Sequence, residues 1–153
     1  MNNTAALAAA GRGNPIPGSE SAAAGLIEDR AGRLDVLVNN AGITGGRPQE
    51  PSAVSPATVR AAVEINVIGV IRVTNAVLPL LRRSASPRID VKELRDTGIL
   101  INAACPGYVA TDLNGFRGVR TPEEGAAIAI RLATLPDDGP TGGFFDDAGV
   151  VPW

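Results

Sequence analysis

Short, continuous apolar runs alternate with longer segments of helical spacing in this chain, and this order restricts the fold more than any single residue does. The two clearest runs are Leu34 to Asn39 and Ile99 to Ala103. Strands that are apolar on both faces are typical of parallel sheets covered by helices on both sides. The order therefore predicts the α/β class, with a doubly wound parallel sheet.

Two helices are predicted around the first run. The segment from Ser19 to about Gly32 combines good helix formers with Ser19 as a possible N-cap. A long amphipathic helix is predicted over residues 56–83, because Ser55 can cap it and Pro56 suits the first helical position.

The second half of the chain predicts three further elements. A short helix is expected to end near Gly98, before the strand Ile99 to Ala103. Thr121 and Glu124 have the spacing of a capping box and predict another helix. The segment TGGFFDDAG is expected to supply a last short strand.

Residues 1–18 are rich in Ala, Gly, Asn and Pro, and their apolar residues follow neither the spacing of a helix nor that of a strand. They are therefore expected to form a disordered leader before a single domain over residues 19–153. The net charge of −2 comes from scattered residues, which argues against a nucleic-acid or polybasic membrane surface. No signal-like segment is evident, and the apolar stretches contain Arg or Asn. A soluble, cytoplasmic protein with no nucleic-acid or membrane partner is expected.

The residue counts limit the chemistry. The chain has one cysteine, Cys105, and no histidine. Disulfides, Cys/His zinc sites and His-dependent triads are thereby excluded, and no metal site is expected. Without a histidine to activate it, Cys105 is interpreted as a small buried hydrophobic residue.

Four segments occur in the order found in one known family. They are LDVLVNNAG, INVIGVIRVTNAVLPLL, INAACPGYVATDL and GPTGGFFDDAG, and together they span roughly residues 34–149. The chain resembles the short-chain dehydrogenase/reductase family, whose members are NAD(P)-dependent oxidoreductases with a Rossmann-like fold. The segments TPEEGA and GFFDDAG look most like the carbonyl-reductase-like branch, which reduces small ketones and aldehydes.

The resemblance implies that Asn39, Asn40, Ala41 and Gly42 lie beside the adenosine part of the cofactor, NADP or NAD. Small residues at the carboxyl end of a strand let the backbone approach a ribose. The alternative is that this Asn- and Gly-rich strand end is only a turn.

Asn66 lies among apolar residues on the predicted long helix. By resemblance it is the asparagine of the family's catalytic tetrad, which bends the helix and holds a water of the proton relay. A hydrogen-bonded structural amide is the alternative.

By resemblance, Pro106, Gly107, Val109 and Thr111 form the segment that meets the nicotinamide end of the cofactor. The backbone of Val109 would contact the nicotinamide carboxamide, and the Thr111 hydroxyl would form a hydrogen bond with the cofactor. A strand that ends in Pro-Gly leaves backbone groups free for a ligand. An ordinary exit from a strand is the alternative.

The glycine-rich phosphate loop of the family is not evident. Only GRGNPIPG offers suitable glycines, but no apolar strand precedes it, and Pro15 and Pro17 oppose a helix start. It is therefore not expected to be a dinucleotide loop.

The catalytic serine, tyrosine and lysine of the family have no counterparts either. The family requires a tyrosine with a lysine four residues later. The only tyrosine, Tyr108, follows the only lysine, Lys92, and Asp112 stands four residues after Tyr108. No such pair exists, so activity of this chain as an enzyme is uncertain.

The family segment that carries the serine, tyrosine and lysine is missing from this chain. We expect the loss at the junction of Asp90 and Val91. Only eight residues separate Asp90 from Ile99, fewer than the dozen or so that a crossover between parallel strands requires. We expect a partial Rossmann-like sheet that lacks the first strands and most of the fifth. Exposed sheet edges and low stability should follow unless the chain repacks or oligomerises.

The sequence thus leaves two functions open. One, implied by the resemblance, is an NAD(P)-dependent oxidoreductase of small carbonyl or alcohol substrates, but a chain without the glycine-rich loop and the serine, tyrosine and lysine is expected to be inactive alone. The alternative is a non-catalytic fragment that associates with a full-length relative as a homo- or hetero-oligomer.

Overall fold

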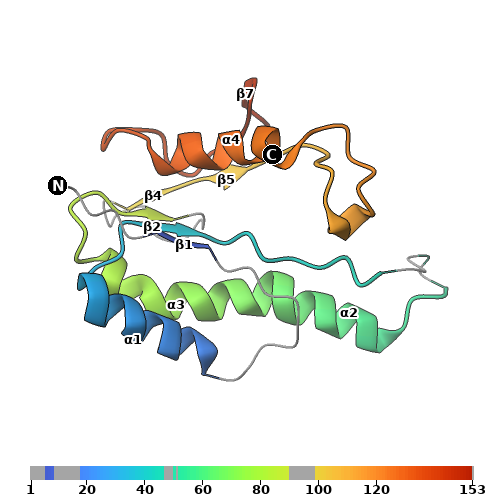
Figure 1. The fold of residues 1–153 in the computed structure, drawn as a ribbon, viewed down its shortest axis with the longest axis horizontal. Coiled ribbons are helices and arrows are strands. Elements are labelled where there is room, and N and C mark those ends of the chain that lie inside the picture. The colour runs from blue at the N-terminus through green and yellow to red at the C-terminus, as the bar shows by residue number, and fades with distance from the viewer. Residues whose placement is uncertain (1–5, 9–17, 47–49, 51, 90–98, 153) are drawn as a thin grey trace.

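The computed structural model describes residues 6–8, 18–46, 50, 52–89 and 99–152, and Figure 1 shows their arrangement. The helices are α1 (Ser19–Ala31), α2 (Pro56–Val63), α3 (Val70–Leu81) and α4 (Pro122–Ala133). A π-helical turn, η1 (Glu64–Gly69), joins α2 to α3, and η2 (Asp112–Asn114) is a 3₁₀ turn.

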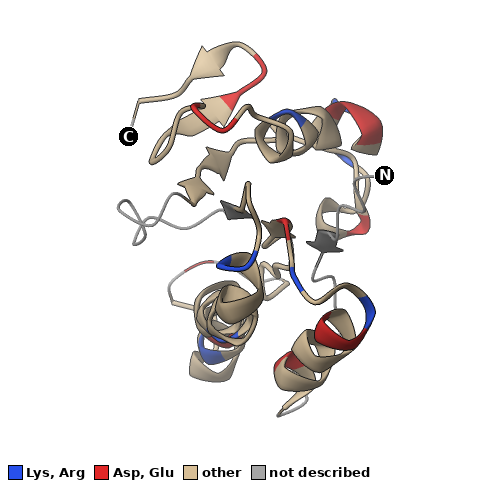
Figure 2. Ribbon diagram, turned by 90° about the vertical axis from the view of Figure 1, so that its left-hand side faces the viewer, with Lys and Arg blue, Asp and Glu red and all other residues tan. Residues whose placement is uncertain are grey.

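The strands form two small sheets. The first has the order β1 (Ala6–Ala8), β2 (Val36–Val38), β3 (Arg88–Ile89) and β4 (Leu100–Ile101), and its neighbouring strands are all parallel. The second contains β5 (Ala103–Ala104), β6 (Phe144–Asp146) and β7 (Gly149–Val150), with β5 parallel and β7 antiparallel to β6. Helices α1 and α3 lie on one side and α4 on the other, as Figures 1 and 2 show. The predicted α/β class with a partial, largely parallel sheet is confirmed.

The core lies between the first sheet and the α1 and α3 helices. The seven buried residues of its central cluster are Leu34, Leu37, Val77, Leu80, Leu81, Ile99 and Ile101. Because side chains alternate along a strand, Leu37 and Ile101 face this cluster and their strand neighbours face the α4 side. The α4 side of the sheet is where the candidate site lies.

The long helix and the last helix begin as predicted. The Ser55 hydroxyl accepts a hydrogen bond from the Thr58 N–H at 3.1 Å, with Pro56 following. At α4, the Thr121 hydroxyl accepts from the Glu124 N–H at 3.2 Å, and the Glu124 carboxylate accepts from the Thr121 N–H at 2.7 Å. Both capping interactions are confirmed.

The first helix starts differently. Gly18, in the left-handed region at φ 85°, precedes α1, and Ser19 is the first helical residue without a side-chain cap. Glycine adopts this conformation at little cost, so it replaces the predicted cap. The predicted end is confirmed, because Gly32 follows Ala31 and donates its N–H to the Glu28 carbonyl at 2.9 Å.

Strand β1 was not predicted. It lies within the predicted leader, and its register places Leu7 opposite Leu37 of β2. Alanine has a weak preference for strands, so this short segment gives little signal in the sequence. The expectation that no apolar strand precedes GRGNPIPG is therefore wrong. Residues 9–17 lie outside the described residues, and the boundary at residue 18 stays a prediction.

The strands of the second half are shorter than predicted. Arg88–Ile89 forms a two-residue strand that pairs in parallel with both β2 and β4, despite the short connection. The predicted strand Ile99 to Ala103 is split at Asn102, whose amide donates to the Pro140 carbonyl at 2.7 Å and accepts from the Gly143 N–H at 3.1 Å. The helix predicted to end near Gly98 falls outside the described residues.

Candidate functional site

An open cleft of about 1340 Å³ lies between the exit of β2, the loop after β5 and helix α4. Its lining includes all eight residues predicted from the sequence to contact a cofactor, namely Asn39, Asn40, Ala41, Gly42, Pro106, Gly107, Val109 and Thr111. The two segments are distant in the sequence, but the fold brings them to one cleft. What binds there is a separate question, and the assignment to a cofactor stays a prediction.

The first wall is the extended segment that follows β2. Asn39 is half-buried, and its amide donates a long hydrogen bond of 3.4 Å to the Thr74 hydroxyl on α3. Further along, the Asn66 side chain accepts from the Ile43 N–H at 2.9 Å and donates to the Ile43 carbonyl at 2.8 Å. The long helix thus holds this wall at two points.

The π-helical turn η1 contains Asn66. Such turns insert one extra residue into a helix and often mark functional sites. Here both ends of the Asn66 amide are satisfied by the Ile43 backbone, and Asn66 is not among the residues that line the cleft. These contacts are those of a structural amide that positions the wall, and they do not test the predicted relay role.

Replacing Asn66 by alanine is expected to lower the free energy of unfolding by about 1 kcal/mol, because two exposed hydrogen bonds to the Ile43 backbone are lost. Urea denaturation would measure it. Asn75→Ala, at an exposed position of α3, is the matched control and should change stability less. Equal effects of the two substitutions would contradict the positioning role.

The second wall is a loop whose two ends lie against each other. The Ala110 N–H donates to the Arg120 carbonyl at 2.8 Å, and the Val119 N–H donates to the Tyr108 carbonyl at 2.9 Å. Gly118 lies so close to the Val109 backbone that a Cβ there would be 2.1 Å from the Val109 carbonyl carbon. We call residues 108–110 and 118–120 the loop neck.

Asn114 organises the interior of this loop and was not predicted as a site residue. Its amide donates to the Val109 carbonyl at 2.8 Å and accepts from the Thr111 N–H at 3.3 Å. Asparagine often bonds the backbone of a turn in this way, so its place three residues after Thr111 was a usable signal. Asn114 therefore fixes the backbone of two of the predicted cofactor residues.

Helix α4 forms the third wall. Gly125 is buried there, and a Cβ at this position would lie 2.4 Å from a methyl carbon of Val109. Ile128 is 1% exposed. The close contact ties the loop to α4 and gives the cleft a mainly apolar side.

Cys105 precedes the loop and is half-buried, and its N–H donates to the Phe145 carbonyl at 2.7 Å. It is not among the residues lining the cleft. This position gives it no role in the site. Groups of acidic, Cys or His residues able to hold a metal are absent from the described parts of the chain.

The helical stretch Pro56–Leu81 is long and apolar enough to cross a membrane by length and composition alone: an 18-residue window within it has a mean hydropathy of 1.5, and 11% of that window is buried. Core helices of soluble proteins have the same property. Here Val77, Leu80 and Leu81 pack into the core. The cytoplasmic location stays a prediction.

Comparisons with known proteins agree on the family. The family model described as short chain dehydrogenase matches residues 18–89. The chain is 32% identical to "Short-chain dehydrogenase anuI" of Penicillium roqueforti over 161 aligned positions, which cover 76% of this chain and 63% of that protein. It is 47% identical to "Carbonyl reductase [NADPH] 1" of Rattus norvegicus over 64 residues, which cover 40% of this chain and 23% of the relative.

The chain thus spans less than two thirds of the length of these curated relatives. The Penicillium alignment has 161 positions, more than the 153 residues of the chain, although only 76% of the chain is aligned. Some positions of the relative are therefore aligned to gaps in this chain.

A solved structure supports the fold. The NADPH-bound carbonyl reductase from chicken fatty liver superposes with a TM-score of 0.72 at 22% identity, covering 90% of this chain and 74% of that one. At this identity the likeness concerns the fold alone. The family model over residues 18–89 and the curated relatives agree on one family: the chain is similar to the short-chain dehydrogenases/reductases.

Proposed function

We propose that the cleft is a binding site for NADP or NAD, in a chain of the carbonyl-reductase-like branch that does not turn over substrate by itself. The observation that carries the proposal is the convergence of the β2 exit and the Pro106 to Thr111 segment on one cleft. In doubly wound folds, ligands bind outside the carboxyl ends of the strands.

The lining fits the nucleoside ends of such a cofactor. Asn39 to Gly42 present small side chains and backbone at the strand exit, where an adenosine ribose would be held. Thr111 and the backbone near Val109 would hold the nicotinamide end. Bound there, the cofactor would supply or accept a hydride, and the roles of this chain are to orient it and to limit its contact with water.

The pyrophosphate fits the described lining less well. Among the lining residues of the described chain there is no lysine or arginine. Phosphates would be held there by backbone N–H groups, which bind anions more weakly without a neighbouring cation. Affinity for the dinucleotide should therefore be modest.

The missing tyrosine and lysine pair predicts no turnover by the chain alone. Tyr108 cannot serve in such a pair because no lysine follows it. Purified chain mixed with NADPH and a panel of small ketones and aldehydes should show no oxidation of NADPH above the protein-free rate. Enzyme-dependent oxidation that scales with chain concentration would contradict this part of the proposal.

A second candidate function, association with a full-length relative or another copy, is favoured by an exposed apolar stripe on the long helix. Val59, Val63, Val67 and Ile71 are each 46–51% exposed and follow the spacing of four residues that places side chains on one helix face. Scattered exposed hydrophobic residues are common, but a continuous stripe is typical of an interface.

The stripe predicts a concentration-dependent oligomer. Val63→Lys combined with Val67→Lys places two charges in the stripe and should weaken association at least tenfold, measured by analytical ultracentrifugation. Ala61→Lys, exposed on another face of α2, is the control and should leave association unchanged. A chain that stays monomeric, or an equal effect of the control, would count against this function.

A further inference from the structure

The loop neck is attached to the neighbouring elements through the Arg120 side chain. Its guanidinium forms an ion pair with Asp147, in the turn between β6 and β7, and donates to the Glu124 carbonyl of α4 at 2.9 Å. The Arg120 backbone belongs to the neck, where its N–H donates to the Tyr108 carbonyl at 3.2 Å. One residue thus joins the loop, α4 and the β6–β7 turn.

The same side chain lies against Gly107. A Cβ at Gly107 would be 2.9 Å from the Arg120 Cδ and 3.1 Å from its Nη1. Gly107 and Val109 line the cleft, whereas Arg120 is not among the lining residues. Arg120 therefore packs behind the wall, and it can affect a ligand through the residues that it holds.

The carboxylate partner in this ion pair is held by its own turn. The Asp146 carboxylate accepts from the Ala148 and Gly149 N–H groups at 2.8 and 3.0 Å. Arg131 of α4 donates to the Asp146 carbonyl at 2.8 Å and to the Asp147 carbonyl at 3.4 Å. The Asp147 carboxylate thus extends from a backbone that is bonded to α4, which gives the guanidinium a fixed anchor.

The burial of the pair indicates what it does. The Arg120 side chain is 26% exposed and that of Asp147 is 43% exposed. A pair with this much contact with water contributes little to the stability of a whole chain. It still restricts the guanidinium to one place, and side chains packed behind a site keep its wall in position. The effect should therefore appear at the cleft wall rather than in global unfolding.

We propose that Arg120, anchored by Asp147, is a positioning residue that holds Gly107 and Val109 in the wall of the cleft. The inference deepens the proposed function and rests on it, since the ligand whose binding it affects is NADP or NAD. Loss of the ion pair frees the Arg120 side chain, and the loop neck then opens locally more often.

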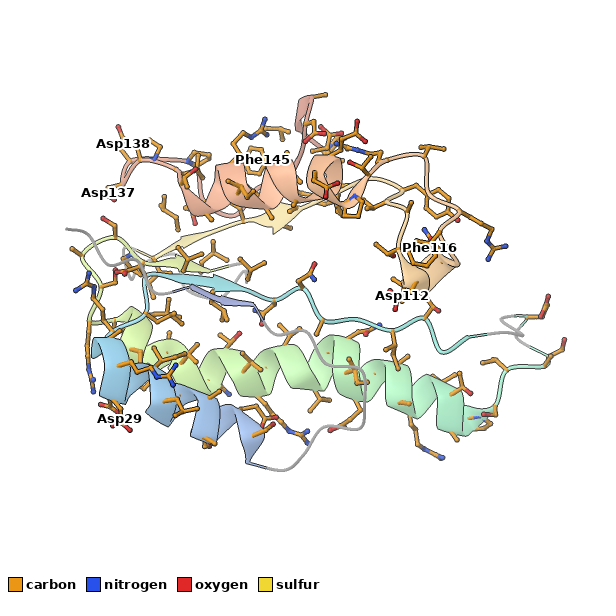
Figure 3. The ribbon with its side chains drawn as sticks, viewed as in Figure 1. Asp29, Asp112, Phe116, Asp137, Asp138 and Phe145 are labelled. Carbon is orange, nitrogen blue, oxygen red and sulfur yellow. The ribbon has the colours of Figure 1, made fainter. Side chains whose placement is uncertain are left out.

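Two variants remove the two halves of the ion pair. Asp147→Asn removes the carboxylate charge with little change in size, and Arg120→Met keeps an apolar stem without the guanidinium. Asp138→Asn is the matched control, because Asp138 is exposed and Figure 3 shows it at the opposite end of the molecule from the loop that carries Phe116. If Arg120→Met does not fold, Asp147→Asn carries both measurements below.

The first measurement is amide hydrogen exchange by NMR, which needs no ligand. The Ala110 and Val119 N–H groups donate across the neck. Asp147→Asn should speed their exchange about threefold, the scale of one partly exposed ion pair. Arg120→Met should speed it about tenfold or more, because the bond to the Glu124 carbonyl is lost as well. Amides of the α3 core should exchange at unchanged rates, which separates local opening from global unfolding.

The second measurement is the dissociation constant of NADPH, by calorimetric titration. It should rise by the same factors in the two variants and stay unchanged in Asp138→Asn. The double variant should bind no more weakly than Arg120→Met alone, because the two residues act through one ion pair. Arg120→Lys keeps a positive charge for Asp147 and should recover part of the affinity that Arg120→Met loses.

Unchanged exchange at the neck in Asp147→Asn, an equal effect of Asp138→Asn, or additive effects in the double variant would overturn the inference. Faster exchange with an unchanged NADPH dissociation constant would overturn it too, and would leave the cofactor site intact. If the unmodified chain does not bind NADPH, the proposed function fails, and the exchange rates alone then decide whether Arg120 holds the wall.

Discussion

Replacing Leu81 by alanine is expected to lower the free energy of unfolding by about 3 kcal/mol, within the range for large-to-small substitutions in a core. Leu81 is 0% exposed and lies in the cluster that joins α3 to the first sheet. Small domains have only about 5–15 kcal/mol of stability in total. The strands here are two or three residues long, so a low value in that range is expected.

Urea denaturation followed by circular dichroism would measure the change at Leu81. Leu26→Ala on α1 is the matched control, because Leu26 is 56% exposed and loses little burial. The control should change stability by less than about 0.5 kcal/mol. If Leu81→Ala is no more harmful than Leu26→Ala, the helix does not pack on the sheet as described.

Gly118→Ala is expected to open the loop neck and to cost at least about 2 kcal/mol, the scale of overpacking against atoms that cannot move aside. The added Cβ would lie 2.1 Å from the Val109 carbonyl carbon and 2.2 Å from the Ala110 nitrogen, and both are backbone atoms. Relief of the clash would separate the two segments of the loop neck and break the hydrogen bond between the Ala110 N–H and the Arg120 carbonyl. The cleft wall at Thr111 should then lose its position.

The same substitution is expected to weaken ligand binding in the cleft about tenfold or more, since a loss of 1.4 kcal/mol in binding corresponds to a factor of ten. Thermal denaturation and titration with NADPH would measure the two effects. Gly25→Ala is the control, because a Cβ at this helical position meets no atom within 4 Å. It should stabilise the chain by up to about 1 kcal/mol. A Gly118→Ala variant as stable as the unmodified chain would contradict the described neck.

The sequence predicts the parts of the fold that depend on local chemistry. The Ser55 cap and the capping box of Thr121 and Glu124 form as expected, because each needs only residues three positions apart. The apolar run from Leu34 gives β2, since its valines and leucine can be buried on both faces. The resemblance of these segments to short-chain dehydrogenases/reductases agrees with the comparisons with known proteins.

The parts that depend on distant partners were not predictable. Strand β1 is three residues of low strand preference, and its pairing with β2 is decided by the neighbouring strand rather than by its own sequence. Strand β7 pairs with β6 through a turn in which the Asp146 carboxylate accepts from the Ala148 and Gly149 N–H groups at 2.8 and 3.0 Å. That turn was present in the sequence as DDAG and was a missed signal.

In the candidate site, too, local features were predictable from the sequence and long-range contacts were not. The eight residues predicted to contact a cofactor lie in two separate segments of the sequence, and only the fold shows that they line one cleft. The Asn66 contacts with Ile43 and the Asn114 contacts within the loop join residues through side-chain geometry, which spacing alone does not give. The charges of Arg120 and Asp147 were visible in the sequence, but their contact was not.

The most direct test of the cofactor site is a calorimetric melt of the 153-residue chain with and without NADPH. A ligand at a hundred times its dissociation constant adds roughly 2.7 kcal/mol to a folded protein that binds it. For a domain of this size, that corresponds to an increase in melting temperature of several degrees, at about 2–4 °C per kcal/mol. We predict one cooperative transition that moves upward with NADPH. A transition that stays in place at saturating NADPH, or no cooperative transition at all, would contradict a cofactor site in this cleft.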